Sequence, residues 1–340
     1  MAPDGLHLCT GSCACRGPPE RRDSSTVLHV TNGDSAAQRL RDAGIGGQEL
    51  PWRDELHEGP VPAGLDDERL RVARARFAAA LGWASEERLL ADLGARDARL
   101  DGAIAAGEGV VLWFETDLYD MLQLAQVLDR LRIGMAATLV LVGEREFAGV
   151  AELGDDELRA ALAGDAARAR ARTLDERVAT AGRDLWAAFR APEPDAIGRL
   201  AAAGTPALPA LGQAAARLLE QFPWRATNVN RTERALRQAV ADGAATPVEA
   251  FRVQQESEER PFMGDATVFE YLRRLGSGRG PLLQTAGGRL ALTGLGRAVL
   301  DGAREWEERP ERWLGGVRLP PGSSPWRYDP ATGRLAGGAS

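Results

Sequence analysis

Two apolar segments of this chain run directly into polar turns, and this pattern limits the possible folds more than any other feature. Residues 27–34 read Val-Leu-His-Val-Thr-Asn-Gly-Asp, and residues 110–120 read Val-Val-Leu-Trp-Phe-Glu-Thr-Asp-Leu-Tyr-Asp. Short apolar runs that end in turn residues are typical of buried strands. Ligands of open α/β sheets bind beyond the carboxyl ends of the strands, so these polar turns predict a binding site.

Residues 26–145 alternate between apolar strands and amphipathic helices. Alternation of this kind predicts a mainly parallel, Rossmann-like sheet. Asp34 or Ser35 is expected to cap the first helix, and Gly44 to end it. The expected elements are strands at 27–31, 48–50, 110–114 and 137–142, with helices at 34–43, 65–81, 86–105 and from 118 onward.

The chain after residue 145 divides into three further segments. Residues 146–227 are Ala- and Arg-rich and are broken by prolines, which indicates a helical connector. Residues 228–319 carry two capping boxes, a third helix and a hairpin around a Gly-Gly turn, which is the element order of a winged-helix-like α+β domain. Residues 320–340 are expected to form a C-terminal tail held down by Trp326.

Composition excludes several functional classes. A chain of 340 residues predicts two or three domains, and its net charge of −7 disfavours a general nucleic-acid binder. All 42 basic residues are arginine, so a Schiff-base lysine and a phosphate-loop lysine are excluded. No apolar run approaches the roughly 20 residues of a membrane span, and no signal segment is evident. We therefore expect a cytoplasmic protein, and the arginine, alanine and glycine usage indicates a GC-rich bacterial genome.

Residues 1–25 are rich in Gly, Pro and charge, and they are expected to form a disordered tail. His7, Cys9, Cys13 and Cys15 have the side chains of a soft-metal site. A disordered extension or an over-long start is the simpler interpretation of this segment. An odd number of cysteines in a cytosolic-looking chain predicts no disulfide framework.

The turn after the first strand contains Asn32, Gly33, Asp34 and Ser35. Backbone N–H groups and the dipole of the next helix suit such a turn to a phosphate or carboxylate. It has one glycine and no G-x-G-x-x-G, so the dinucleotide fingerprint is absent. The alternative is a simple helix cap.

Three acids follow the second strand: Glu115, Asp117 and Asp120. Asp117 and Asp120 could merely cap the next helix and complement its dipole. Glu115 follows Phe114 directly at the strand end, so we expect it to bind a divalent cation or to act as a general base.

The densest mixed cluster of the sequence is Trp52, Arg53, Asp54, His57 and Glu58. Arg53 could hold a phosphate or carboxylate with two hydrogen bonds, and His57 could exchange protons near neutral pH. The alternative is a surface ion pair of Arg53 with Asp54, with His57 in a turn. By contrast His29 lies inside a strand and is expected to be a satisfied core residue.

Several of these motifs resemble a bacterial family known only as a domain of unknown function, number 1835. The resemblance covers roughly residues 26–145 and implies no established reaction. Residues 261–265, Pro-Phe-Met-Gly-Asp, and 312–316, Arg-Trp-Leu-Gly-Gly, are similar to the companion region of such domains. The motifs that carry it are Leu28-His-Val-Thr-Asn-Gly-Asp-Ser35, Leu50-Pro-Trp-Arg-Asp54, Leu56-His-Glu-Gly-Pro-Val-Pro62 and Leu112-Trp-Phe-Glu-Thr-Asp-Leu-Tyr-Asp120.

The leading hypothesis is that the protein binds or hydrolyses a small phosphorylated or nucleotide-like ligand. His57 and Glu115 would be acid/base groups, Arg53 would hold the anion, and Asp34 and Asp117 would bind ligand or metal. Asp34, Arg53, His57 and Glu115 are expected to line one cleft. The remaining predicted ligand-binding residues are Asn32, Gly33, Ser35, Trp52 and Asp54.

The alternative is a ligand-responsive module that acts through the domain at 228–319. Its third helix carries Arg273 and Arg274 but also Glu270, and acids precede it. A protein-contacting or structural role is favoured over DNA binding, because base readout needs a basic surface. A third hypothesis is a non-catalytic scaffold.

Overall fold

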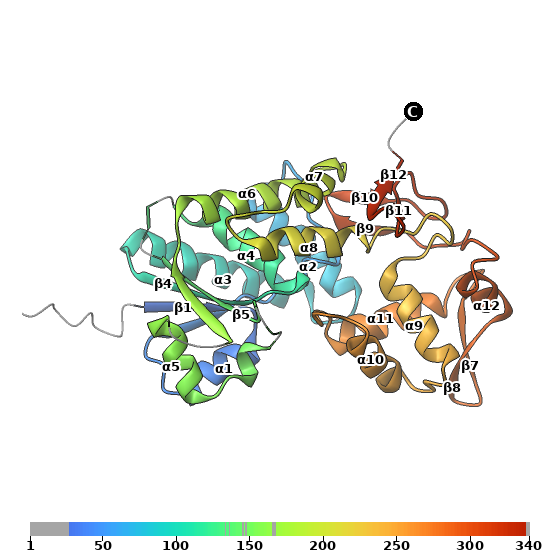
Figure 1. Cartoon of the computed structure of the whole chain (residues 1–340), viewed down its shortest axis with the longest axis horizontal. Coiled ribbons are helices and arrows are strands. Elements are labelled where there is room, and N and C mark those ends of the chain that lie inside the picture. Colours follow the sequence, from blue (N-terminus) through green and yellow to red (C-terminus); the bar gives the residue numbers. More distant parts are fainter. Residues whose placement is uncertain are drawn as a thin grey trace, which may run out of the picture.

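The computed structural model describes residues 27–337 apart from residues 133, 136, 145, 147 and 165–167 (Figure 1). The expected tail at 1–25, with its histidine and three cysteines, lies outside the described residues. None of the helices in the described ranges combines the length and apolarity that crossing a bilayer requires.

A five-stranded sheet of order β2-β1-β4-β5-β6 lies in the N-terminal half of the chain. Its first four strands are parallel, and β6 pairs antiparallel with β5. The chain is therefore a mixed α/β protein with a mostly parallel sheet, as the alternating pattern predicts. The strands are β1 (Val27–Thr31), β2 (Gln48–Pro51), β4 (Gly109–Glu115), β5 (Ala137–Val142) and β6 (Ala169–Thr173).

The prediction that the strand at 137–142 completes the sheet is wrong. The sheet continues into the segment that was expected to be purely helical, where β6 reads Ala-Arg-Ala-Arg-Thr. This sequence has no strong strand propensity except at its threonine. Its conformation depends on backbone pairing with β5, which the local sequence does not reveal.

Helices cover both faces of the sheet (Figure 1). Trp113 of β4 belongs to the same buried cluster as residues of α1 and α5, whereas its neighbours Leu112 and Phe114 belong to the larger cluster with α4. This alternation follows from the period of two in a strand. The helices are α1 (Asp34–Asp42), α2 (Asp67–Ala80), α3 (Glu86–Ala106), α4 (Leu118–Arg130), α5 (Asp155–Ala163) and α6 (Glu176–Arg190), with a short 3₁₀ turn η2 (Val150–Glu152).

Helix caps agree in part with the sequence. Asp117 caps α4, because its carboxylate accepts a hydrogen bond from the Asp120 N–H at 3.0 Å. The prediction that Asp34 or Ser35 caps α1 is wrong, because Gly33 occupies the cap position and provides no side chain. Gly44 adopts a left-handed conformation directly after that helix, as expected at a helix end.

Residues 231–300 form three helices followed by a hairpin and a short helix. Both predicted capping boxes are present, at Asn230 with Glu233 and at Thr246 with Glu249. Two helices, α7 (Asp195–Ala203) and α8 (Pro209–Leu219), precede this part. Its elements are α9 (Arg231–Ala241), α10 (Pro247–Glu256), α11 (Asp265–Leu275), β7 (Leu283–Ala286), β8 (Arg289–Leu292) and α12 (Gly294–Leu300).

The end of the chain returns to its beginning. Strand β9 (Arg312–Gly315) pairs in parallel with β3 (Gly59–Pro60) and antiparallel with β10 (Val317–Leu319). Gly315 has a φ of 58°, and a Cβ at this position would lie 2.2 Å from the Phe189 carbonyl oxygen. Only glycine fits this contact with the end of α6.

The segment expected to be a tail includes a hairpin of β11 (Arg327–Asp329) and β12 (Arg334–Ala336). The Trp326 side chain before it is buried, and the ring of Tyr328 lies 6.4 Å from that of Trp224. Aromatic packing therefore anchors this end of the chain, as the sequence predicts.

Candidate functional site

The carboxyl ends of β1 and β4 lie side by side at the point where the strand order reverses. In the sheet, β2 pairs with β1 on one side of this point, and β5 pairs with β4 on the other side. Asn32 follows β1, and its amide donates hydrogen bonds to Glu115 Oε1 at 3.2 Å and to Asp120 Oδ1 at 3.0 Å. This is the position at which open α/β sheets bind their ligands.

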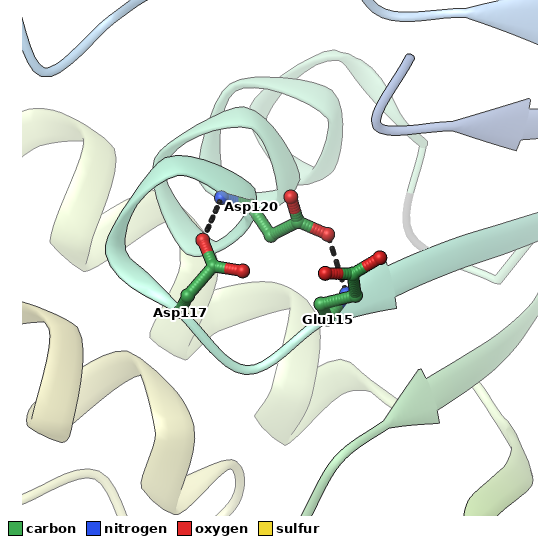
Figure 2. Close-up of side chains that lie close together, drawn as sticks. All are labelled: Glu115, Asp117 and Asp120. Atoms are coloured by element: carbon green, nitrogen blue, oxygen red, sulfur yellow. Dashed lines mark hydrogen bonds between the residues drawn. The ribbon is translucent and has the colours of Figure 1, made fainter. Parts of the chain in front are cut away.

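Glu115, Asp117 and Asp120 form a compact group here, which we call the carboxylate triad (Figure 2). One oxygen of each residue lies within 4.8 Å of the others. Glu115 Oε1 accepts a hydrogen bond from the Val150 N–H at 2.8 Å, and Asp120 Oδ2 accepts one from the Glu115 N–H at 2.5 Å. Hard carboxylate oxygens at this spacing are suitable ligands for a divalent cation.

Within the described part of the chain, no arginine forms an ion pair with an acid of the triad. Burial, together with the nearby charge of Glu115, raises the pKa of Asp117 to about 8. Burial also raises the pKa of Glu115. The pKa of Asp120 is raised by burial and by the charges of Asp117 and Glu115. Three ionised carboxylates this close repel one another, so either bound protons or a bound cation must relieve the repulsion.

A pocket of about 230 Å³, which we call the arginine pocket, adjoins the triad. Thr116, Asp117 and Leu118 at the start of α4 form one wall of this pocket. The remaining lining residues are Gln213, Ala214, Arg217, Arg231, Glu258, Glu259 and Arg260. Asp117 therefore belongs both to the triad and to the pocket.

The three arginines of this pocket differ in their partners. Arg217 and Arg231 share Glu258, at 2.6 and 3.2 Å. Arg260 instead donates hydrogen bonds to the Thr116 hydroxyl and, at 3.1 Å, to the Gly143 carbonyl oxygen. No carboxylate of the described residues forms an ion pair with Arg260. Its charge is therefore the most available of the three to an anionic ligand.

The predicted anion-binding residue Arg53 is already paired. Its guanidinium donates two hydrogen bonds to Asp34, at 2.7 and 2.5 Å, and both side chains are more than half exposed. The hydrogen bonds from Arg53 lower the pKa of Asp34. Ser35, at the edge of the same turn, is exposed. Binding of an anion by Arg53 would have to compete with this ion pair.

Trp52 and Asp54 are explained by packing and ion pairing. The Trp52 ring is fully buried, and its N–H donates to Gln126 at 2.8 Å. Arg74 donates two hydrogen bonds to Asp54 Oδ1, at 2.9 and 2.7 Å, while Arg96 lies over the Trp52 ring. We therefore leave both residues out of the cation site. His29 is a satisfied core residue, bonded to Gly46 and Trp113.

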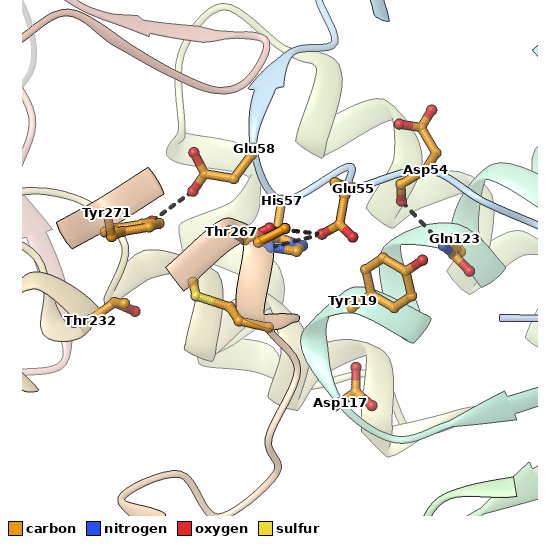
Figure 3. A network of polar contacts seen from close by, with 12 residues as sticks. Asp54, Glu55, His57, Glu58, Asp117, Tyr119, Gln123, Thr232, Thr267 and Tyr271 are labelled. Atoms are coloured by element: carbon orange, nitrogen blue, oxygen red, sulfur yellow. Dashed lines mark hydrogen bonds and ion pairs between the residues drawn. The ribbon is translucent and has the colours of Figure 1, made fainter. Parts of the chain in front are cut away.

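His57 packs against the rings of Tyr119 and Phe262, with ring centroids 5.9 and 5.2 Å away (Figure 3 shows His57 and Tyr119). Its side chain is fully buried, and burial lowers its pKa to about 4. Neither ring nitrogen forms a hydrogen bond within the described ranges, and Nε2 lies 3.6 Å from Glu55 Oε2. This placement gives no support to the acid/base role predicted for His57.

Glu58, the next residue, forms what we call the Glu58 cluster with Tyr271, Arg274 and Arg312 (Figure 3 shows Glu58 and Tyr271). Tyr271 donates to Glu58 at 2.6 Å, Arg274 lies at 3.3 Å, and Arg312 donates to the same carboxylate. Burial by itself would raise the pKa of Glu58, but the two arginines outweigh it and lower the pKa to about 2.

Asp34, Arg53, His57 and Glu115 were expected to share one cleft, and none of the four lines the arginine pocket. Arg53 pairs with Asp34 at the surface, Glu115 belongs to the triad, and His57 is fully buried. Sequence reasoning missed Arg217, Arg231 and Arg260 as pocket residues, because they lie far from the strand ends in sequence. It also passed over Glu55. The only feature of the sequence that could have pointed to Glu55 is its position two residues before His57.

No protein-family model matches this chain, and no curated protein matches its sequence. The resemblance to the domain-of-unknown-function family therefore stays a prediction. Function must be inferred from the geometry of the site.

Proposed function

We propose that this protein binds a small phosphorylated ligand through a divalent cation held by the carboxylate triad. The observation that carries the proposal is that Asp117 belongs to both the triad and the arginine pocket. A cation on the triad would stand at the wall of a pocket whose other side carries guanidinium groups. The Rossmann-like interpretation of the sheet is part of this proposal, since it assigns ligand binding to the same strand ends.

Each residue has a distinct role in the proposal. Glu115 and Asp117 each keep one oxygen free of protein hydrogen bonds in the described part of the chain, and these oxygens would bind the cation. Asn32 orients Glu115 and Asp120 by donating to both. Arg260 would contact the phosphate, because a guanidinium matches its oxygens with paired donors. Backbone N–H groups at the start of α4 would add favourable dipoles.

The charges support this order of binding. The triad without a cation would repel a phosphate, whereas a bound divalent cation offsets most of its negative charge. A phosphoryl group that binds such a cation is also polarised toward attack by water. Hydrolysis is therefore measured together with binding.

The test begins with the metal alone. Binding of Mn²⁺ is followed by electron paramagnetic resonance in the full chain and in an Asp117→Asn variant. Asp175→Asn is the matched control, because Asp175 caps α6 through the Val178 N–H at 2.9 Å just as Asp117 caps α4. Loss of Mn²⁺ binding in Asp117→Asn alone supports the proposal, and no binding by the unaltered chain refutes it.

The second step uses inorganic pyrophosphate and ADP, with calorimetry for binding and a phosphate assay for hydrolysis. Binding of either that depends on Mg²⁺ and is weakened by Asp117→Asn supports the proposal. Binding that is equal with and without Mg²⁺ contradicts the role given to the cation. Phosphate release would make the protein a hydrolase, and its absence would leave a binding protein.

A second candidate function is a ligand-responsive module that acts through a winged-helix-like domain at 228–319. Contacts between α11 and the loop at 55–58 favour it, because Thr267 contacts Glu55 at 3.4 Å and Tyr271 binds Glu58. DNA binding by α11 gains no support. Arg273 pairs with Glu270, and Arg274 pairs with Glu58 inside the protein. Ligand-dependent protection of α11 amides from hydrogen exchange would favour this candidate.

A further inference from the structure

A second pocket, of about 210 Å³, lies beside the loop that follows β2. We call it the Trp83 pocket. Residues of α2, of α3 and of the connection between them form most of its wall, and Tyr119 of α4 belongs to the lining. Its charged lining residues are Arg53, Asp54, Glu55 and Arg74.

The wall that α2 and α3 provide is apolar. Ala75 and Ala78 of α2 contribute only methyl groups, and Leu89 and Leu93 of α3 contribute branched alkyl groups. The partly buried ring of Trp83 adds an aromatic surface between the two helices. A wall of this kind favours a ligand with an apolar carbon skeleton.

Both arginines of the lining already have carboxylate partners. Arg53 donates two hydrogen bonds to Asp34, at 2.7 and 2.5 Å. Arg74 pairs with Asp54 at 2.7 Å, so the charge of Asp54 is compensated inside the protein. An anionic ligand would have to compete with one of these pairs.

Glu55 is the carboxyl group of the lining that has no ion pair with an arginine of the described residues. Its Oε2 contacts Thr267 at 3.4 Å and lies 3.6 Å from His57 Nε2, whereas its Oε1 accepts no hydrogen bond from the described residues. His57 adds no positive charge at neutral pH, because burial lowers its pKa to about 4. Figure 3 shows Glu55 between His57 and Tyr119. With 29 % of its side chain exposed, Glu55 is accessible to a ligand.

A negative charge on Glu55 is unfavourable in the free protein. Burial and the charge of Asp54 raise the pKa of Glu55 to about 7. A cation beside this carboxyl group would favour its ionised form. The rings of Tyr119 and Trp83 belong to the same lining, and aromatic rings attract cations. The Trp83 pocket therefore favours a positively charged ligand group over a negative one.

We propose that the Trp83 pocket binds a small primary amine with an apolar carbon skeleton. The ammonium group would donate to Glu55, and the skeleton would lie against Trp83, Leu89 and Leu93. A primary ammonium fits better than a quaternary one, because Glu55 Oε1 needs a donor. Neither the divalent cation nor the phosphate of the proposed function takes part, so this inference is independent of that function.

The test compares 2-phenylethylamine with 2-phenylethanol, which has the same skeleton and a hydroxyl group in place of the ammonium. Isothermal titration calorimetry uses the full chain with EDTA at mildly alkaline pH, where Glu55 is mostly ionised. The amine should bind, and the alcohol should bind about tenfold more weakly, because it lacks the charge-assisted hydrogen bond. This comparison requires no variant. Failure of the amine to bind, or equal binding of the two compounds, would overturn the inference.

Two matched pairs of variants locate the binding. Glu55→Gln keeps the size of the side chain and removes its charge, so it should weaken amine binding about tenfold. Glu87→Gln, at an exposed position of α3, should leave the affinity unchanged. Ala78→Leu fills the pocket and should also weaken binding about tenfold, whereas Ala80→Leu, exposed on α2, should not. Unchanged amine binding in a folded Glu55→Gln or Ala78→Leu variant would place the amine elsewhere and overturn the inference.

Discussion

The carboxylate triad and the Glu58 cluster place buried acids in opposite electrostatic surroundings. Burial alone would raise the pKa of Glu58 and the pKa of Asp117. The pKa of Glu58 is nevertheless lowered, whereas that of Asp117 is raised. Glu58 contacts two arginines and a tyrosine, and its pKa falls to about 2. Asp117 has acids as its charged neighbours, and its pKa rises to about 8. The positive partner, rather than burial, determines the charge that each site carries at neutral pH.

This contrast separates a structural site from a functional candidate. A buried carboxylate with arginine partners is satisfied without any ligand. A group of buried acids without such partners is unfavourable in the free protein, and unfavourable arrangements of this kind concentrate at binding and catalytic sites. The Glu58 cluster should therefore matter for folding, and the triad for binding.

The largest expected effect is on folding. Glu58→Gln leaves Arg312 and Arg274 without their shared anion inside the protein, so it should lower the free energy of unfolding by about 3–5 kcal/mol. Urea denaturation measures this change. Glu193→Gln, in the exposed connection between α6 and α7, should have almost no effect. A loss below about 1 kcal/mol for Glu58→Gln would show that the cluster is not structural.

Stability should depend on pH with opposite signs at the two sites. The ordinary pKa of Asp117 is 3.8 and its folded pKa is about 8. Between these values the folded carboxyl holds a proton that the unfolded chain has released. The contribution of Asp117 to the free energy of unfolding is therefore complete below pH 3.8. It is lost as the pH rises through 8, by about 1.4 kcal/mol per pH unit.

Glu58 acts in the other direction. Its ordinary pKa is 4.5 and its folded pKa is about 2, so its contribution is present above pH 4.5 and is lost as the pH falls through about 2. Urea denaturation at several pH values, with Asp117→Asn compared with the unaltered chain, tests both signs. Asn retains the helix cap. Identical pH profiles for the two proteins would show that Asp117 titrates normally.

A smaller effect is expected at Arg260, where the triad and the arginine pocket meet. Arg260→Ala should weaken Mg²⁺-dependent pyrophosphate binding roughly tenfold, which is the loss of one charge-assisted hydrogen bond. Arg252→Ala is the control, because Arg252 is 70 % exposed on α10 and does not line the arginine pocket. Calorimetry should find that the Arg252→Ala variant binds pyrophosphate with unchanged affinity. Equal losses in both variants would indicate only a general effect of charge.

The smallest expected change in stability is at Glu115. Glu115→Gln removes one of three repelling charges and keeps an oxygen for the Val150 N–H, so stability should stay the same or rise by up to about 1 kcal/mol. Binding of Mn²⁺ should be lost in the same variant. Chemical denaturation together with Mn²⁺ titration checks both results. A destabilisation of about 1–3 kcal/mol would mean that Glu115 is a structural residue.

The sequence predicts local features well where a single segment contains all the information. The apolar run before Asn32 and the period of α4 are local, and the structure has both elements where they were expected. For Asp117 the two interpretations left open by the sequence are compatible, because it caps α4 and belongs to the triad. A short acidic motif can serve both purposes.

Features that depend on distant contacts were not predictable. Arg260 lies 144 residues from Thr116 in the sequence, and only the packed structure brings them together. Partial burial and the nearby charge of Asp54 raise the pKa of Glu55 to about 7, and nothing in its flanking residues reveals that burial. In the same way β6 is a strand because β5 is available for pairing.

The pairing of β3 with β9 has a consequence for the order in which this chain folds during synthesis. Arg312 and Glu58 are separated by 254 positions, so the loop at 55–60 waits until nearly the whole polypeptide has left the ribosome. Closing so long a loop also makes this contact slow to form. The segment that carries Glu55 and Glu58 is thus completed last, and a nascent or prematurely terminated chain lacks it in its final form.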